Sequence, residues 1–249
     1  ASSPAILGDG TAVVSADNKI HGVRPNGTSA WTALPAGAVT LTGAPSAGPT
    51  ALFVGSLDNK LYAAKFDGSA LVSAGCDTTG DPKGTPAVSM SNPEIAFVGN
   101  DAKQMRSSKA DSLPCNATPV ADAFTTSPVI DQAGRIFAAT VAGTSSVHRF
   151  SDSGGCLLIH DWDVIAGINI VEGPAIDSLG RVIVGSQDNF LYRVQDNGAG
   201  DGTASQLGVA LGGIPRQSAV IAQNGDIVVG TNTGALHRRS DLGIDIWTP

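Results

Sequence analysis

The chain has no long apolar run, few charged residues and few aromatic ones. No stretch reaches the roughly 18 apolar residues that a membrane-spanning helix requires, so we expect a soluble protein. Charged residues make up only 15% of the 249 residues, and aromatic residues only 5%. The 15 Lys and Arg residues are outnumbered by 22 Asp and Glu, which gives a net charge of −7. Nucleic-acid binding requires clustered positive charge, so we expect no nucleic-acid partner.

Signatures of common catalytic sites are also absent. The sequence has no phosphate-binding loop, nucleophile elbow, zinc-ligand spacing or dinucleotide fingerprint. The three cysteines, Cys76, Cys115 and Cys156, have neither metal-binding spacing nor an adjacent His or acid. An odd number cannot all pair within a monomer, although Cys76 and Cys115 lie near predicted loops and could form a disulfide. The sequence thus predicts no catalytic residue, no metal ligand and no cofactor.

What the chain does contain is turn residues and a repeat. Its 31 Gly and 14 Pro residues, with short runs of Val, Ile, Thr and Ser, predict many short strands joined by tight turns. Each unit opens with a related dipeptide, and the six are Ser3-Pro4, Ala44-Pro45, Thr85-Pro86, Ser127-Pro128, Gly173-Pro174 and Gln217-Ser218. Their spacings are 41, 41, 42, 46 and 44 residues.

Within each unit, two predicted strands are especially regular. The second is almost wholly apolar, as in Val182-Ile-Val-Gly-Ser186, which is typical of a strand buried on both faces. The third has His, Tyr or Met at its second position, namely His21, Tyr62, Met105, His148, Tyr192 and His237. Equivalent positions of different units lie apart, so we expect these side chains to pack between units with their polar tips hydrogen-bonded, rather than to bind a metal.

Four strands in each of six units predict an all-β fold, a six-bladed β-propeller with four antiparallel strands per blade. One domain would cover residues 1–249, with blades at about 1–42, 43–83, 84–125, 126–171, 172–215 and 216–249. The last blade would end in a fourth strand at Gly243-Ile-Asp-Ile-Trp247. The ring would then close by packing between the first and last blades, or be completed by a longer chain.

The repeat resembles the PQQ-like repeat of the quinoprotein alcohol dehydrogenase-like superfamily, which is common in non-catalytic bacterial propellers. The best matches are Val54-Gly-Ser-Leu-Asp-Asn-Lys-Leu-Tyr-Ala63 and Val184-Gly-Ser-Gln-Asp-Asn-Phe-Leu-Tyr192. The Trp that ends the family's repeat is present in two units only, at Trp31 and Trp247, so the dehydrogenase subgroup matches poorly. The resemblance implies an extracytoplasmic bacterial protein, located in the periplasm, on the outer surface or in the medium.

One candidate site interrupts the repeat in its longest unit, at His160, Asp161, Trp162 and Asp163. Extra residues in a propeller usually form loops on one face, where ligands are met. A Trp flanked by carboxylates could stack on a sugar ring or anchor a partner protein. The alternative is that these residues extend an outer strand.

A second candidate site is the set of arginines that directly follow the His/Tyr/Met column, Arg106, Arg149, Arg193 and Arg238. They form either an arc that recognises carboxylates or other anions, or separate ion pairs with acidic turn residues such as Asp131 and Asp177.

We therefore expect a non-catalytic interaction or scaffold module, a monomeric propeller whose loops meet a protein or glycan partner. One alternative is a PQQ- and Ca²⁺-dependent dehydrogenase, although the predicted inner strands lack a convergent set of acidic ligands. Another is a structural spacer or tip domain of a larger surface protein. A site is expected where the repeat is broken, in the third and fourth units.

Overall fold

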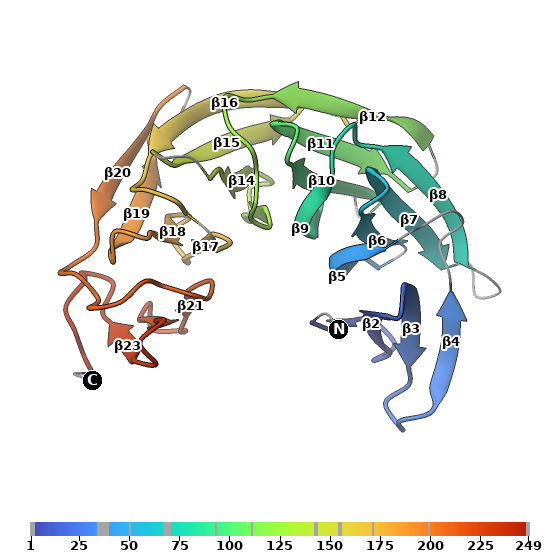
Figure 1. Ribbon diagram of the computed structural model, residues 1–249, viewed down its shortest axis with the longest axis horizontal. Coiled ribbons are helices and arrows are strands. Elements are labelled where there is room, and N and C mark those ends of the chain that lie inside the picture. The colour runs from blue at the N-terminus through green and yellow to red at the C-terminus, as the bar shows by residue number, and fades with distance from the viewer. Residues whose placement is uncertain are drawn as a thin grey trace. The chain divides into compact units, whose positions relative to one another are not determined.

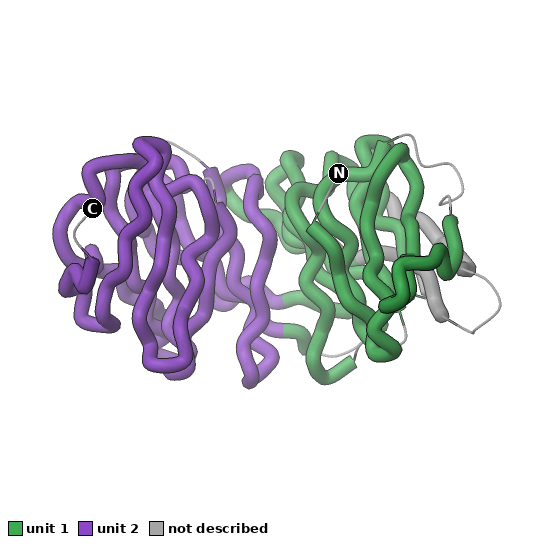
Figure 2. Tube along the Cα trace, turned by 90° about the horizontal axis from the view of Figure 1, so that it is seen from below, with its two compact units in different colours: residues 1–121, 152–158 green, residues 122–151, 159–249 purple. Residues whose placement is uncertain are grey.

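The computed structural model describes residues 3–33, 40–49, 51–66, 71–92, 94–110, 112–141, 144–153, 156–170, 172–198 and 200–247. In these ranges every regular element is a β-strand, and the strands form six antiparallel sheets, which confirms the predicted fold class. Among the described residues no helix is long and apolar enough to span a membrane. The chain divides into unit 1 (residues 1–121 and 152–158) and unit 2 (residues 122–151 and 159–249), which Figure 2 distinguishes by colour.

Unit 1 contains the first three sheets, in which four consecutive strands pair in chain order (Figure 1). The strands are β1 (Ala5–Ile6), β2 (Ala12–Ala16), β3 (Lys19–Val23), β4 (Ser29–Ala33), β5 (Leu41–Ala47), β6 (Ala51–Ser56), β7 (Lys60–Phe66), β8 (Leu71–Asp77), β9 (Pro82–Val88), β10 (Ile95–Asn100), β11 (Gln104–Lys109) and β12 (Ser112–Pro119).

The other three sheets follow the same order and belong to unit 2, apart from the last residue of β15 and the first residue of β16. Their strands are β13 (Val129–Ile130), β14 (Ile136–Ala139), β15 (Ser146–Asp152), β16 (Leu158–Ile165), β17 (Ala175–Ile176), β18 (Val182–Gly185), β19 (Leu191–Asp196), β20 (Gly202–Gln206), β21 (Val220–Ile221), β22 (Ile227–Gly230) and β23 (Leu236–Arg239).

The sixth sheet differs from the prediction because its described part has three strands. Residues 243–247 were expected to form the fourth, but only one bridge is present, between Arg239 and Asp245. The N–H groups of Ile246 and Trp247 both donate to the carbonyl oxygen of Arg238. Because two successive donors share one acceptor, a regular ladder does not continue here.

The apolar second strands form the cores of both units, as predicted. Every residue of β6, β10 and β14 is buried. Phe53 of β6 packs with Val98 of β10 in unit 1, and Phe137 of β14 packs with Val182 of β18 in unit 2. Each such side chain contributes about 1.5–3 kcal/mol through burial, so these contacts between sheets dominate the stability of each unit.

The glycine that ends the apolar run of the second strand allows the next sheet to approach closely. A Cβ atom on Gly55 would lie 2.8 Å from Cβ of Pro82, and one on Gly185 would lie 2.5 Å from Cβ of Pro215. Pro82 begins β9 and Pro215 precedes β21, so in both cases a proline of the following sheet occupies the space. At Gly230, the equivalent position of the sixth sheet, an added Cβ would have no atom of the described residues within 4 Å.

Two residues of the third-strand column, Tyr62 and Tyr192, have hydrogen-bonded polar tips as predicted, and the preceding Asp-Asn turn supplies the acceptor. His21 and His237 differ from the prediction, because the Nε2 atom of each is buried without a hydrogen-bond partner among the described residues. The hydroxyl of Tyr62 donates to Asp58 Oδ2 over 2.7 Å, and that of Tyr192 donates to Asp188 Oδ2 over 2.8 Å. The Asn that follows each Asp has a positive φ, 61° at Asn59 and 70° at Asn189. Asn tolerates this conformation better than most residues, which explains why Asp-Asn recurs at this turn.

The predicted disulfide between Cys76 and Cys115 lies outside the described residues, because the side chains of both positions are not among them. Cys156 is buried. Its carbonyl oxygen accepts hydrogen bonds from Ser107 Oγ and from Asn116 Nδ2, the latter over 3.1 Å, so it is held against the third sheet.

Candidate functional site

The segment from His160 to Asp163 is a strand and not a loop. It forms the middle of β16, which pairs with β15 as the outer strand of the fourth sheet. The interpretation as an extended outer strand is therefore correct, and the prediction of a loop that presents these four residues to a ligand was wrong. Their side chains still take part in two polar clusters, one around His148 and one around Asp196.

The first cluster joins two imidazoles and a carboxylate of unit 2. Nδ1 of His148 lies 3.1 Å from Nε2 of His160, and this Nε2 lies 3.8 Å from Oδ1 of Asp163. One ligand atom from each of the three residues lies within 4.8 Å of the other two. His148 is buried, His160 is partly exposed and Asp163 is exposed, so the cluster opens to solvent on the Asp163 side.

Aromatic rings fix the orientation of the two imidazoles. The ring of Phe124 meets His148 edge-on at a centroid distance of 5.7 Å, and the ring of Phe150 lies 5.1 Å from that of His160. Burial lowers the pKa of His148 to about 4, against the opposing effect of the Asp163 carboxylate. His148 is thus neutral at neutral pH and keeps one nitrogen lone pair for a hydrogen bond or a ligand.

The second cluster is centred on Asp196, the last residue of β19, whose side chain is only 3% exposed. Its Oδ1 accepts hydrogen bonds from Arg149 Nη1 over 3.0 Å and from Trp162 Nε1 over 3.3 Å, and its Oδ2 accepts one from Arg135 Nη1 over 2.5 Å. Nε of Arg149 also lies 3.4 Å from Oδ2 of Asp161. This network connects the fourth sheet to the fifth.

Trp162 is part of the core of unit 2 and does not face solvent. It is 5% exposed, packs against Phe137 and covers Gly202, where an added Cβ would lie 2.8 Å from its ring. The predicted role as a stacking platform for a sugar or a partner is therefore contradicted. The carboxylates that flank Trp162 in the sequence suggested a polar surface. In the structure the indole N–H of Trp162 needs a buried acceptor, and Asp196 provides it.

The four column arginines have different partners. Arg149 and Arg238 are held by carboxylates, and Arg238 donates to Oδ2 of Asp226 over 2.8 and 2.5 Å. Arg106, in unit 1, is buried and donates to Thr79 Oγ1. Separate pairing thus describes Arg149 and Arg238, although the carboxylates are not those of Asp131 and Asp177, which bind Arg135 and Arg181 instead.

Arg193 is the exception among the column arginines. Its Nε and Nη2 are buried and have no hydrogen-bond partner among the described residues. Burial, together with the neighbouring charge of Arg181, lowers the pKa of its guanidinium. The residue paired with Arg193 on β20 is Ser205, which has no charge to offer, whereas Arg149 lies near the carboxylate of Asp161 on β16.

One apolar face of the sixth sheet is exposed, whereas the equivalent face of the fifth sheet is covered. Leu191 begins β19 and is 0% exposed, whereas Leu236 begins β23 and is 52% exposed. Ile183 of β18 is fully buried, whereas Val228 at the same position of β22 is only half-buried. With the open space at Gly230, these residues define a face that we call the open face: Val228, Gly230 and Leu236.

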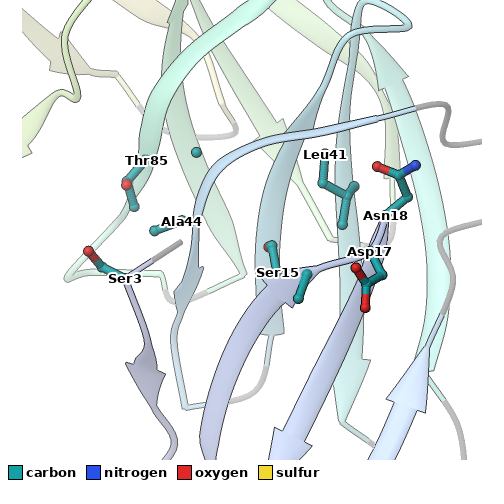
Figure 3. Close-up of a pocket in the computed structure, with 9 residues that line it drawn as sticks. Ser3, Ser15, Asp17, Asn18, Leu41, Ala44 and Thr85 are labelled. Atoms are coloured by element: carbon teal, nitrogen blue, oxygen red, sulfur yellow. The ribbon is translucent and has the colours of Figure 1, made fainter. Parts of the chain in front are cut away.

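A polar hollow of about 480 Å³ lies in unit 1, and none of the predicted site residues lines it. Figure 3 shows Ser3, Ala44 and Thr85 on one side and Leu41, Ser15 and Asp17 on the other. Its lining is Ser3, Ser15, Ala16, Asp17, Asn18, Leu41, Gly43, Ala44 and Thr85. Only Asp17 is charged among these, so the lining offers one carboxylate and not a convergent set of acidic ligands.

The sequence analysis treated His148 as a packing residue and His160 as part of a loop, and so missed that they meet. A signal was present, because the two residues are twelve positions apart on paired strands. Paired antiparallel strands bring side chains on the same face within reach of one another.

No protein-family model and no curated protein sequence matches the chain. Solved structures do match. BamB from Moraxella catarrhalis is 14% identical with a TM-score of 0.75, over 99% of this chain and 71% of BamB. A chain of the Mitotic Checkpoint Complex is 15% identical with a TM-score of 0.71, over 95% of this chain and 73% of that chain. A putative gluconolactonase is 12% identical with a TM-score of 0.54, over 86% of this chain and 79% of that chain. At such identities the likeness shows the fold alone, which is that of a β-propeller.

Proposed function

We propose that this chain is a non-catalytic, PQQ-like β-propeller that binds a partner protein outside the bacterial cytoplasm. The repeat motifs at residues 54–63 and 184–192 support the PQQ-like class and, through it, the extracytoplasmic location. Among the similar structures, one propeller is part of a protein complex, so the fold is compatible with this role.

The observation that carries the proposal is the open face of the sixth sheet. The same face of the fifth sheet is covered by the sheet that follows it, with Pro215 packed on Gly185. The open face has apolar side chains and a glycine at the positions that form this contact in the fifth sheet. No described atom lies against Gly230, however. Leu236 is therefore the exposed apolar side chain of this face at which the proposal can be tested, and a partner that covers its exposed half would gain about 1 kcal/mol from it.

A protein is a better fit than a glycan or a substrate. The open face consists of aliphatic side chains, which bury well against another apolar surface and offer no hydrogen bonds to sugar hydroxyls. The ring that was predicted to stack on a sugar, Trp162, is buried. The arginines Arg149 and Arg238 are occupied by carboxylates and so are not available to polarise a substrate.

A photo-crosslinking experiment tests the proposal. Benzoylphenylalanine replaces Leu236 on the open face or, as a matched control, Leu179, which is 68% exposed in a turn of the fifth sheet. We expect a discrete crosslinked protein from position 236 only, in intact cells of the source bacterium. The substitution Leu236→Lys should then weaken binding of that purified partner by about tenfold or more, since it places a charge in an apolar contact.

Equal crosslinking at both positions, or none at either, would contradict the proposal. So would reduction of a dye by the purified protein in the presence of PQQ and Ca²⁺, because that result would identify a dehydrogenase.

A further inference from the structure

We infer that His148, His160 and Asp163 form a binding site for a divalent transition-metal ion, best suited to Zn²⁺. The site lies within unit 2, on β15 and β16. It is separate from the open face and does not depend on the function proposed above.

The spacing of the donor atoms fits a metal ion. A tetrahedral Zn²⁺ with bonds of 2.0–2.1 Å to two imidazoles holds their nitrogens about 3.3 Å apart. Nδ1 of His148 and Nε2 of His160 are 3.1 Å apart. Oδ1 of Asp163 is 3.8 Å from Nε2 of His160, so a small rotation of this exposed side chain completes a set of three ligands. A fourth position is left for water or another ligand.

The surroundings of His148 suit a ligand. Its Nδ1 faces the cluster, and its Nε2 lies 3.4 Å from Oγ1 of Thr140. A metal-bound histidine typically donates its other N–H to such an oxygen, which fixes the ring and its tautomer. Packing against Phe124 and Phe150 holds the imidazoles in place, so little side-chain entropy is lost when the ion binds.

Among the described residues, such a cluster of two imidazoles and a carboxylate occurs only in the fourth sheet. His21 occupies the same column position in the first sheet, but the residue opposite it on β4 is Thr32, whose Oγ1 is 3.2 Å from His21 Nδ1. A second imidazole is therefore what distinguishes the fourth sheet. Two imidazoles and one carboxylate favour Zn²⁺, Cu²⁺ or Ni²⁺ over Mg²⁺ and Ca²⁺, which prefer oxygen ligands.

The test uses the tag-free full chain and metal ions alone. Calorimetric titration with Zn²⁺ should give one ion per chain, and His160→Gln and Asp163→Asn should each lower the affinity by about tenfold or more. These two positions are chosen because they are at least partly exposed, whereas substitution of buried His148 endangers folding. His21→Gln is the matched control and should bind as the parent does.

Cobalt identifies the ligands. Bound Co²⁺ should show visible absorption from nitrogen and oxygen ligands, and circular dichroism should confirm that each variant is folded. The inference is overturned if the parent binds no stoichiometric Zn²⁺, or if a folded His160→Gln/Asp163→Asn double variant keeps the parent affinity. A near-ultraviolet thiolate charge-transfer band would also overturn it, by assigning the ion to cysteine.

Discussion

Arg149 and Arg193 occupy the same position of the third strand in neighbouring sheets but differ in their surroundings. Arg149 lies between the carboxylates of Asp196 and Asp161. Arg193 has two buried nitrogens without a hydrogen-bond partner among the described residues. A buried charge stabilises a fold when it is paired and is costly when it is not, so the two arginines are expected to contribute differently to stability.

Substitution by methionine tests this difference while keeping the aliphatic stem. Arg149→Met leaves Asp196 with one fewer donor and should lower the free energy of unfolding by about 2–3 kcal/mol. Arg193→Met removes an unsatisfied charge and should change it by less than about 1 kcal/mol, or raise it. Urea unfolding of the two variants measures both values, and equal destabilisation would contradict the expectation.

His148 makes stability depend on pH. Its pKa is lowered to about 4 in the fold by burial, whereas an unfolded histidine has a pKa near 6.5. Between these pH values the unfolded chain binds a proton that the folded chain does not, so the free energy of unfolding falls as the pH falls. The total loss expected from this residue is about 3 kcal/mol.

The variant His148→Phe isolates this contribution from that of the carboxylates. Its aromatic ring is suited to the contacts with Phe124 and Phe150 but cannot titrate. Unfolding measured from pH 7 to pH 4 should be less pH-dependent in the variant than in the parent. The same pH dependence in both proteins would show that His148 is not the group responsible.

At the scale of the strand, the glycine of the Val-Gly-Ser motif sets how closely two sheets pack. Gly185→Ala places a methyl group 2.5 Å from Cβ of Pro215, so the sheets must shift. We expect a loss of about 1–3 kcal/mol, as for other overpacked sites. Gly230→Ala, in the same motif position of the sixth sheet, meets no atom of the described residues within 4 Å and should be neutral or stabilising by up to about 1 kcal/mol. Thermal unfolding compares the pair, and a larger loss at Gly230 would contradict this account.

The second and third strands were predictable because each one carries its own signal. The apolar run of β18 predicted burial, and the Asp188-Asn189 turn predicted the hairpin that follows. The predicted strand at residues 243–247 was wrong although its residues alternate between apolar and polar. Ile244 remains 64% exposed, so the pattern there has no buried contact that would fix a fourth strand.

For the molecule as a whole, the repeat was enough to predict six similar sheets, because each repeated unit forms one. It was not enough to predict the candidate site, because the repeat compares equivalent positions and the site joins non-equivalent ones. His148 belongs to the column, whereas His160 and Asp163 do not. Likewise Asp196 binds Arg135 and Arg149 of a different sheet, a contact that depends on packing between sheets.

The hydrogen bond from each column tyrosine to its turn aspartate has a spectroscopic consequence. Burial, assisted by Asp58 and Asp188, raises the pKa of Tyr62 and Tyr192 above the ordinary value near 10. The chain has only these 2 tyrosines, one in each unit. At a pH near or slightly above 10 the folded protein should therefore show less tyrosinate absorbance than an unfolded chain at the same pH.

Denaturant titration at this pH should then increase the tyrosinate absorbance as each unit unfolds. The variants Tyr62→Phe and Tyr192→Phe leave one phenol each, so their absorbance follows unit 2 and unit 1 separately. Equal tyrosinate absorbance before and after denaturation would contradict the assignment. Because each phenol belongs to one unit, this intrinsic chromophore distinguishes a chain whose units melt together from one whose units melt in turn.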